Sequence, residues 1–202
     1  ADGVQATVET CPTYLFFDEN DFLRKGPVLK SGPPVRSRQE VERLWQRVLA
    51  GQVDVIGSDH SPSTWDLKAI GEQDIWKAWG GMSGVQTMLP VLLSEGVHKR
   101  GQALPELVRM TSAGPARLFG VYPKKGSLQP GADADLTVVN LAAEWTLEPE
   151  MLFYQNKYSA YDGLRFKGKV VQTLVRGQTV YRDGQIRVAS GYGKYLRRGE
   201  TN

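Results

Sequence analysis

The stretch GSDHSP, residues 57–62, places Asp59 and His60 directly after a short apolar run that begins at Val53. In parallel α/β folds, catalytic groups gather at the carboxyl ends of the strands, because the loops there form a mouth above a rigid sheet. A carboxylate at such a position can ligate a metal ion or act as a general base beside a metal-activated water. An Asp before Ser-Pro can also do no more than cap the following turn, and the spacing alone leaves both interpretations open.

Few other side chains offer chemistry, because the chain has two histidines and one cysteine. His60 stands beside a loop, where a histidine is more often a structural hydrogen-bonding group than a ligand, and His98 lies in the charged segment SEGVHKR. Cys11 has no histidine near it in sequence to act as a base, which favours a buried structural thiol over a nucleophile. The acidic segment GADAD, residues 131–135, predicts a plain turn, with calcium binding as a distant alternative.

Composition narrows the class of protein. A length of 202 residues fits one large domain or two small ones, and an apolar content of 41% is enough for a core. The net charge of +3 is concentrated in the tail, residues 193–200, and gives no reason to expect a nucleic-acid partner. A single cysteine excludes an internal disulfide and fits a reducing, cytoplasmic compartment. No run of about 18 apolar residues occurs, so we expect no membrane partner.

The elements that must position these residues alternate between strand and helix, as in an α/β protein. Residues 5–9 predict a strand that stops at Pro12, and residues 53–58 predict a buried second strand. Residues 22–37 predict a loop because they are rich in Gly and Pro. A helix capped by Ser37 follows. Its predicted apolar stripe consists of Val41, Leu44, Val48 and Leu49.

The later part of the chain changes character. Residues 62–79 predict a long loop, which in a compact domain is usually functional, and a glycine-rich turn at 80–84 leads into apolar helices. We expect an α/β part over residues 1–122 and a small all-β module over residues 123–202, with a return segment near 149–163. The α/β part holds two to three strand–helix units, too few to close an eight-unit barrel of about 250 residues.

Several segments together resemble, in this order, the C-terminal half of cyclic amidohydrolases. These segments are VETCPTYL, SGPPVRS, GSDHSP, AWGGMSGVQTMLPVLL, TSAGPARLFG, KGSLQPGADADLTVVNL and NKYSAYDG. They are most similar to the motifs of allantoinases, followed by those of hydantoinases, dihydropyrimidinases and dihydroorotases. The resemblance implies an α/β chain that forms the C-terminal part of a TIM-like (β/α)8 barrel. Residues 1–122 would be its last βα units, and residues 123–202 a composite β-sandwich module built from both ends of the full chain.

The resemblance also implies a binuclear divalent metal centre, with zinc favoured over cobalt, manganese or iron, bridged by a carboxylated lysine and a hydroxide. Most of its ligands would lie outside this chain, and only the aspartate at the end of the eighth strand is present, matching Asp59. Asp59 would ligate one metal and pass the proton of the attacking hydroxide to the leaving nitrogen. Ser31 and Gly32, and Gly80 in WGGMSG, would offer backbone groups to the substrate, and His60 is a further substrate-binding candidate.

The activity implied is the hydrolytic opening of a cyclic amide or ureide, first of all allantoin to allantoate in purine catabolism. Hydantoinase or dihydropyrimidinase activity is the alternative. Ser63 stands where dihydroorotases commonly carry a histidine, which argues against that branch. A non-catalytic structural homologue of dihydropyrimidinase is the other alternative, and the presence of Asp59 favours the enzyme.

The resemblance further implies two macromolecular partners: the N-terminal half of the barrel, and other copies of the chain in a homo-oligomer, a tetramer in this family. The chain begins at ADGVQATV, without an initiator Met, a basic region or an apolar leader. We therefore expect it to be a piece of a longer protein and to be inactive alone.

Overall fold

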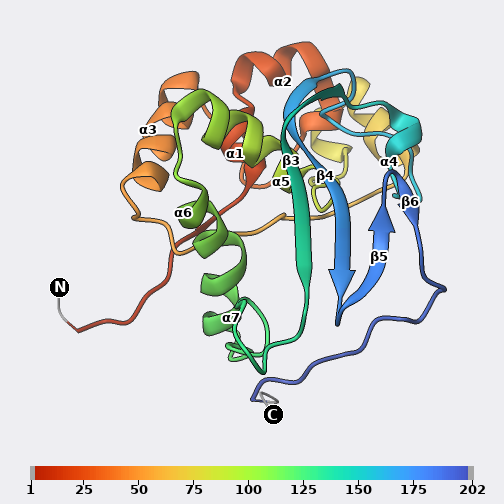
Figure 1. The fold of residues 1–202 in the computed structure, drawn as a ribbon. Coiled ribbons are helices and arrows are strands. Elements are labelled where there is room, and N and C mark those ends of the chain that lie inside the picture. The colour runs from red at the N-terminus through yellow and green to blue at the C-terminus, as the bar shows by residue number, and fades with distance from the viewer. Residues whose placement is uncertain (1–2, 200–202) are drawn as a thin grey trace.

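Two sheets organise the fold of the computed structural model, which describes residues 3–199 (Figure 1). Strands β1 (Glu9–Thr10) and β2 (Val55–Ile56) are parallel neighbours, with Thr10 paired to Ile56. Four further strands form an antiparallel sheet in the order β3-β4-β5-β6. Their bounds are β3 (Leu136–Thr146), β4 (Arg165–Val175), β5 (Gln178–Arg182) and β6 (Gln185–Ile186). Residues 1–2 and 200–202, the outer ends of the two expected parts, lie outside the described residues.

Helical segments supply most of the regular structure before β3, and α5 and η4 pack against β4. The α-helices are α1 (Pro12–Phe16), α2 (Glu19–Lys25), α3 (Arg38–Leu49), α4 (Trp65–Ala69), α5 (Met88–Val91), α6 (Leu104–Val108) and α7 (Gly114–Leu118). The 3₁₀ turns are η1 (Gly26–Leu29), η2 (Ile70–Glu72), η3 (Ile75–Lys77) and η6 (Pro149–Met151), and the π-helical segments are η4 (Leu92–His98) and η5 (Arg109–Ala113). Figure 1 shows α3, α6 and α7 to one side of β3, with β4, β5 and β6 continuing on the other.

Helix α3 confirms the predicted cap and most of the predicted stripe. Ser37 Oγ accepts a hydrogen bond from the backbone N–H of Glu40 at 3.4 Å, which satisfies one of the donors at the helix start. Val41 and Val48 are buried as predicted, but Leu49 is 44% exposed and its inclusion in the stripe was wrong. Trp45, which the predicted stripe leaves out, lies four residues after Val41 on the same face and is 2% exposed, whereas Leu49 is the last residue of the helix. The indole N–H of Trp45 donates to the carbonyl of Leu15 at 2.6 Å.

The first predicted strand is shorter and later than expected. Of residues 5–9, only Glu9 belongs to β1, which continues to Thr10. Pro12 does not simply stop this strand but begins helix α1, where its missing N–H costs nothing because that position has no intrahelical acceptor. The result is a direct strand-to-helix transition at Cys11, the residue at the helix N-cap.

Two segments predicted as loops contain regular structure. Residues 22–37 include the end of α2 and all of η1. Helix α2 is fixed by Asp18, whose carboxylate accepts from the N–H of Asp21 at 3.0 Å while the Asp21 side chain accepts from the N–H of Asp18 at 2.9 Å. This reciprocal capping box lies upstream of the Gly- and Pro-rich stretch that suggested a loop. Residues 62–79 likewise hold α4, η2 and η3, each too short to give a clear periodicity.

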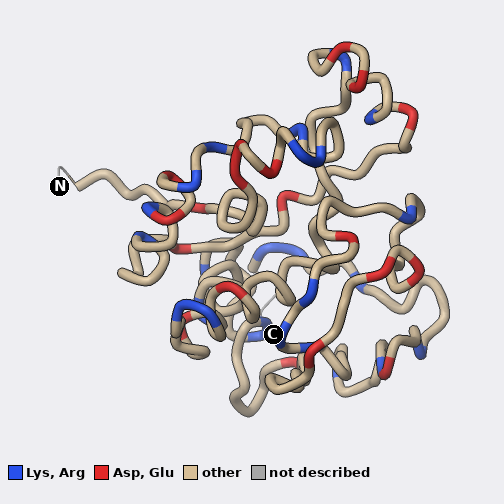
Figure 2. Tube along the Cα trace, turned by 90° about the horizontal axis from the view of Figure 1, so that it is seen from above, with Lys and Arg blue, Asp and Glu red and all other residues tan. Residues whose placement is uncertain are grey.

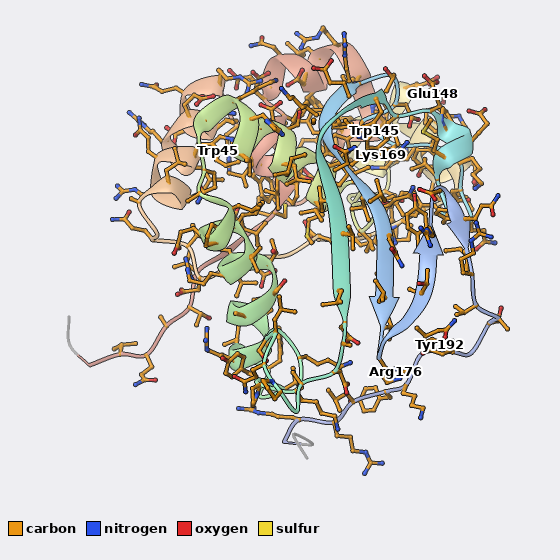
Figure 3. The ribbon with its side chains drawn as sticks, in the orientation of Figure 1. Trp45, Trp145, Glu148, Lys169, Arg176 and Tyr192 are labelled. Atoms are coloured by element: carbon orange, nitrogen blue, oxygen red, sulfur yellow. The ribbon has the colours of Figure 1, made fainter. Side chains whose placement is uncertain are left out.

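The core has two clusters of buried side chains. The first lies around α3 and the π-helical segments and contains Leu15, Val41, Trp45, Val48, Val53, Ile56, Leu92, Leu93, Leu107 and Met110. The second joins the antiparallel sheet to the α/β part and contains Phe17, Leu29, Val35, Met82, Val91, Leu147, Leu152, Ala160, Tyr161 and Phe166. Figure 3 shows Trp145 on β3 beside Lys169 on β4, whose Nζ lies 5.6 Å from the indole ring.

The surface carries charges of both signs, and Figure 2 shows Lys and Arg interspersed with Asp and Glu along the trace. In the GADAD turn, Lys125 Nζ lies 2.8 Å from an oxygen of Asp133 and 2.5 Å from one of Asp135. Asp135 also accepts from the backbone N–H of Arg176 at 2.8 Å. These contacts support a plain turn whose carboxylates are neutralised by a lysine. Among residues 3–199, no helix is long and apolar enough to cross a membrane.

Candidate functional site

Asp59 lies three residues beyond the end of β2, with its side chain exposed and its backbone in the left-handed region at φ 48°. Within the described residues its carboxylate has one hydrogen-bond partner, the thiol of Cys11, with Sγ 3.9 Å from Oδ2. No backbone N–H of the following turn donates to it, since the N–H of Ser61 donates to the carbonyl of Met82 at 2.8 Å. Asp59 therefore does not act as the turn cap that its sequence also allowed, and its oxygens are open to a ligand.

Cys11 and Asp59 meet because they follow neighbouring parallel strands, and the carboxyl ends of such strands lie at one edge of the sheet. The side chain of Cys11 is 3% exposed. Burial raises the pKa of this thiol, and the negative charge of Asp59 raises it further. Cys11 is thus a protonated donor toward the carboxylate and not an activated nucleophile.

His60 is held by the backbone of the glycine-rich turn. Its Nδ1 accepts from the N–H groups of Gly84 at 3.0 Å and Val85 at 3.4 Å, and its ring lies 5.2 Å from that of Tyr154. Because Nδ1 accepts these two hydrogen bonds, the tautomer of the neutral ring that fits them carries its proton on Nε2. His60 is therefore both a structural clamp on the turn and an exposed donor beside Asp59 in the sequence.

The glycines of WGGMSG have two different roles. A Cβ on Gly81 would lie 2.4 Å from Ser61 Oγ, and one on Gly84 would lie 2.3 Å from the carbonyl oxygen of Ser58. These two glycines let the turn lie directly against the segment that carries the candidate site. A Cβ on Gly80 would meet nothing within 4 Å. Gly80 therefore borders open space, as a residue with a backbone contact to a substrate must.

The SGPP segment is fixed by two hydroxyl groups that share one acceptor. Tyr14 OH and Ser31 Oγ each donate to the carbonyl oxygen of Pro33 at 2.9 Å. The hydroxyl of Ser31 is thus engaged within the segment, which leaves its backbone as the group that it can offer. Gly32 is exposed, and a Cβ there would meet nothing within 4 Å. Burial raises the pKa of the Tyr14 hydroxyl, and Cys11 and Asp59 raise it further. The backbone N–H of Tyr14 donates to the carbonyl of Cys11 at 3.2 Å, so this tyrosine joins the SGPP segment to the end of β1.

Sequence reasoning missed three side chains that shape this region: Tyr14, Tyr158 and Lys68. Tyr158 OH lies 2.9 Å from Ser63 Oγ and donates to the Ser63 carbonyl at 2.8 Å. Ser63, which is 8% exposed, therefore faces the interior. Lys68 is fully buried on α4. None of these contacts has a local sequence signal, because each joins segments distant in the chain. The remaining histidine, His98, is the last residue of η4.

The described residues fit a single ligand of a metal centre. Among residues 3–199, no three side chains of His, Cys, Asp and Glu come together as a metal-binding group. Asp59 offers open carboxylate oxygens, which suit a divalent cation, and Cys11 is engaged with it at 3.9 Å. Stable catalytic sites use three or more protein ligands, so a metal held by Asp59 needs partners from outside the described residues.

The chain belongs to the amidohydrolase family, whose model matches residues 27–180. An allantoinase of Rubrobacter xylanophilus is 47% identical over 195 residues, which are 96% of this chain and 42% of the relative. An allantoinase of Solibacter usitatus is 44% identical over 195 residues, with the same coverage of 96% and 42%. The solved structure of an L-hydantoinase from Arthrobacter aurescens has a TM-score of 0.93 at 39% identity, covering 95% of this chain and 43% of that one. The chain thus spans about two fifths of the length of these relatives.

Proposed function

We propose that this chain is the C-terminal part of a cyclic amide hydrolase, and that its substrate is a cyclic ureide, first of all allantoin. The observation that carries the proposal is the open carboxylate of Asp59 at the strand end, in a chain 47% identical to an allantoinase. The exposed glycines Gly32 and Gly80 each border open space, and we propose that their backbone groups face the same substrate. Hydrogen bonds link Asp59 to the SGPP segment: Cys11 Sγ lies 3.9 Å from Asp59, the backbone N–H of Tyr14 donates to the carbonyl of Cys11 at 3.2 Å, and Tyr14 OH donates to the carbonyl of Pro33.

In the full protein, residues 1–122 would form the last βα units of an eight-stranded barrel, and β1 and β2 would be its last strands. The sheet β3-β4-β5-β6 would be one layer of a β-sandwich over residues 123–202, and the chain outside these residues would supply the other layer. The return segment near 149–163 is supported by its contacts with Gln86. Gln86 Nε2 donates to the carbonyl of Met151 at 2.7 Å, and its backbone N–H donates to Tyr154 OH at 2.7 Å.

The hydrolysis requires one proton to move from the oxygen of the attacking water to the leaving ring nitrogen. When bound, a pair of divalent metals, for which we propose zinc ahead of cobalt, manganese or iron, activates the attacking water and polarises the amide carbonyl. Asp59 would ligate one metal through one oxygen and accept the water proton on the other. As the new C–O bond forms and the ring C–N bond breaks, Asp59 would deliver that proton to the leaving nitrogen.

The substrate would be held by the backbone and by a single imidazole. A cyclic ureide presents alternating N–H and C=O groups, which match the N–H and C=O groups of Ser31, Gly32 and Gly80 without any side chain between them. His60 would add an N–H donor through Nε2, because its Nδ1 is occupied by the glycine-rich turn. Fixed backbone donors lose little entropy on binding, which is why such segments serve as substrate cradles.

Hydantoinase activity is the second candidate. The structure of the L-hydantoinase from Arthrobacter aurescens matches at a TM-score of 0.93, and a hydantoin ring presents the same ureide edge. A non-catalytic homologue is the remaining alternative. The carboxylate of Asp59 supports the enzyme, because its hydrogen-bond partner among the described residues is the weakly donating Cys11 thiol and it remains exposed to a ligand.

The test compares Asp59→Asn and Asp59→Ala with wild type in the full-length protein, on allantoin, hydantoin and dihydrouracil. We expect the ratio kcat/KM to be highest for allantoin, and both variants to lose at least about 10²-fold in kcat. Asp54→Asn is the matched control, because Asp54 lies on the same segment but accepts from the backbone N–H of Val8 at 2.8 Å. Near-normal turnover by the Asp59 variants would overturn the proposal, and a wild type inactive on all three rings would favour the non-catalytic homologue.

Two further proposals concern the setting of the enzyme. We expect a homo-oligomer, tetrameric as implied by the resemblance, which light scattering on the full-length protein measures directly. We also expect a cytoplasmic location, because Cys11 is a buried free thiol and suits a reducing compartment.

A further inference from the structure

Lys68 is a fully buried lysine, with a relative exposure of 0%. Its Nζ donates to the carbonyl oxygens of Lys30 at 3.0 Å and Trp79 at 2.9 Å. Within residues 3–199 its partners are these two carbonyls and not a carboxylate. Burial, and then the charge of Lys30, lower the pKa of Lys68 to about 8. A buried lysine without a counter-ion is costly, which raises the question of what its position serves.

The two carbonyls belong to the residues directly before the two proposed substrate-binding segments. Lys30 precedes Ser31 and Gly32, and Trp79 precedes Gly80. Because both carbonyl oxygens bond to the same nitrogen, Lys68 fixes the spacing between two backbone segments that lie far apart in the chain. The indole N–H of Trp79 also reaches the carbonyl of Ser61, at 3.4 Å, which links this arrangement to the segment that carries Asp59.

Independent contacts show that the same two segments are packed tightly. Lys30 Nζ donates in the other direction, to the carbonyls of Trp76 and Ala78 at 2.7 Å each. At Gly71 a Cβ would lie 2.6 Å from Ala78 Cβ and 2.8 Å from Pro27 Cβ. A glycine is therefore required where the loop meets the segment before SGPP. Hydrogen bonds from Lys30 and Lys68 to backbone carbonyls therefore join the segments that precede Gly32 and Gly80, and the close contacts at Gly71 leave little space between them.

We propose that Lys68 is a positioning residue that sets the distance between the substrate-binding backbone of Ser31–Gly32 and that of Gly80. The inference rests on the proposed function, because it needs a ring bound between these segments. A displacement of about 1 Å in a substrate-holding group can reduce catalysis by about 10²-fold. Lysine suits the role in either protonation state, since a neutral amine still has two N–H groups for two carbonyls.

Lys68→Met in the full-length protein is the direct test, because Met has a similar length but no donor. We expect KM for allantoin to rise at least about tenfold, with kcat changed by less than about threefold and the metal content unchanged. Lys77→Met is the matched control: Lys77 belongs to the same segment, residues 62–79, but its side chain is 67% exposed and forms a surface ion pair with Asp74 at 3.6 Å. We expect its KM to stay within about twofold of wild type.

A second variant, Lys68→Gln, separates positioning from core filling. Gln is shorter but carries two N–H donors on one nitrogen, so we expect it to restore part of the KM that Lys68→Met loses. A folded Lys68→Met with an unchanged KM would overturn the proposal. Failure of both variants to fold would also overturn it, since Lys68 would then stabilise the fold and do nothing more specific. A wild-type protein that opens no cyclic amide at all would instead refute the proposed function.

Discussion

The thiol of Cys11 lies 3.9 Å from Oδ2 of Asp59, across the carboxyl ends of two adjacent parallel strands. Parallel pairing brings these residues together although 48 positions separate them in the chain. The contact has two chemical consequences. The carboxylate stays free of stronger donors and open to a ligand, and the thiol is kept protonated by burial and by the neighbouring charge.

The first prediction concerns the reactivity of Cys11. Since its pKa is raised, the thiolate fraction at neutral pH is smaller than that of an ordinary cysteine, and burial limits access as well. We expect iodoacetamide to label Cys11 in the folded full-length protein at least about tenfold more slowly than in the denatured protein. Mass spectrometry of the peptide containing residue 11 measures both rates. Equal rates in the two states would contradict the buried, protonated thiol.

The second prediction contrasts two glycines of one motif. A methyl group on Gly84 would collide with the backbone oxygen of Ser58 at 2.3 Å, whereas one on Gly80 would meet nothing within 4 Å. We expect Gly84→Ala to lower the free energy of unfolding by about 3 kcal/mol or more. Gly80→Ala should leave stability within about 0.5 kcal/mol but raise KM, because its methyl group enters the substrate space.

Thermal unfolding and steady-state kinetics on the full-length protein check this contrast. The backbone of neither glycine is in the left-handed region, so the two substitutions differ in space and not in backbone strain. A Gly80→Ala variant with normal KM would show that the space above Gly80 is not used by substrate. Equal stability of both variants would contradict the packing of Gly84 against Ser58.

Local chemistry predicted some of these features and missed others. Asp59 was identifiable because an apolar run ends at a carboxylate, and α3 because Ser37 and the apolar spacing agree. Lys68 gave no such signal, since its two acceptors are 38 and 11 residues away and are backbone atoms. A lysine in the sequence predicts a solvated side chain by default, and only the tertiary arrangement reverses that expectation.

The predictions at Pro12 and Leu49 were wrong because tertiary packing overrode the local sequence preference. At Pro12 the sequence predicted the end of a strand, but the same residue is favourable in the first turn of a helix, and packing selected that use. At Leu49 the apolar spacing predicts a buried side chain, but this residue is the last of α3 and is 44% exposed. Both errors arise because long-range packing, not local propensity, decides between neighbouring solutions.

The third prediction is a pH dependence of stability carried by Lys68. Its pKa falls from an ordinary 10.5 to about 8 in the folded protein. Between these values the unfolded chain binds a proton that the folded protein has released, so the free energy of unfolding rises with pH across this window. The gain is on the order of 3 kcal/mol.

Denaturant unfolding of full-length wild type and Lys68→Met at pH 8 and pH 10.5 tests this linkage. Titrating groups that do not interact with Lys68 contribute equally to both proteins, so the stability difference between them reports Lys68 together with its charge interaction with Lys30. We expect wild type to become more stable relative to the variant as the pH rises from 8 to 10.5. A difference that is constant with pH would mean that Lys68 keeps an ordinary pKa when folded.

The last prediction concerns residues 1–202 expressed alone. Within the described part of the chain, Asp59 is an isolated carboxylate and no group of three metal-binding side chains exists. A lone carboxylate is a poor chelator in water, and stable catalytic sites use three or four protein ligands. We therefore expect this piece to bind no metal pair and to open no allantoin, even with zinc, cobalt or manganese supplied. Metal analysis and allantoin consumption measure both properties, with the full-length protein as the positive control. Two tightly bound metals with turnover would show that these residues hold a complete site, and would refute the proposal that the remaining ligands come from the rest of the protein.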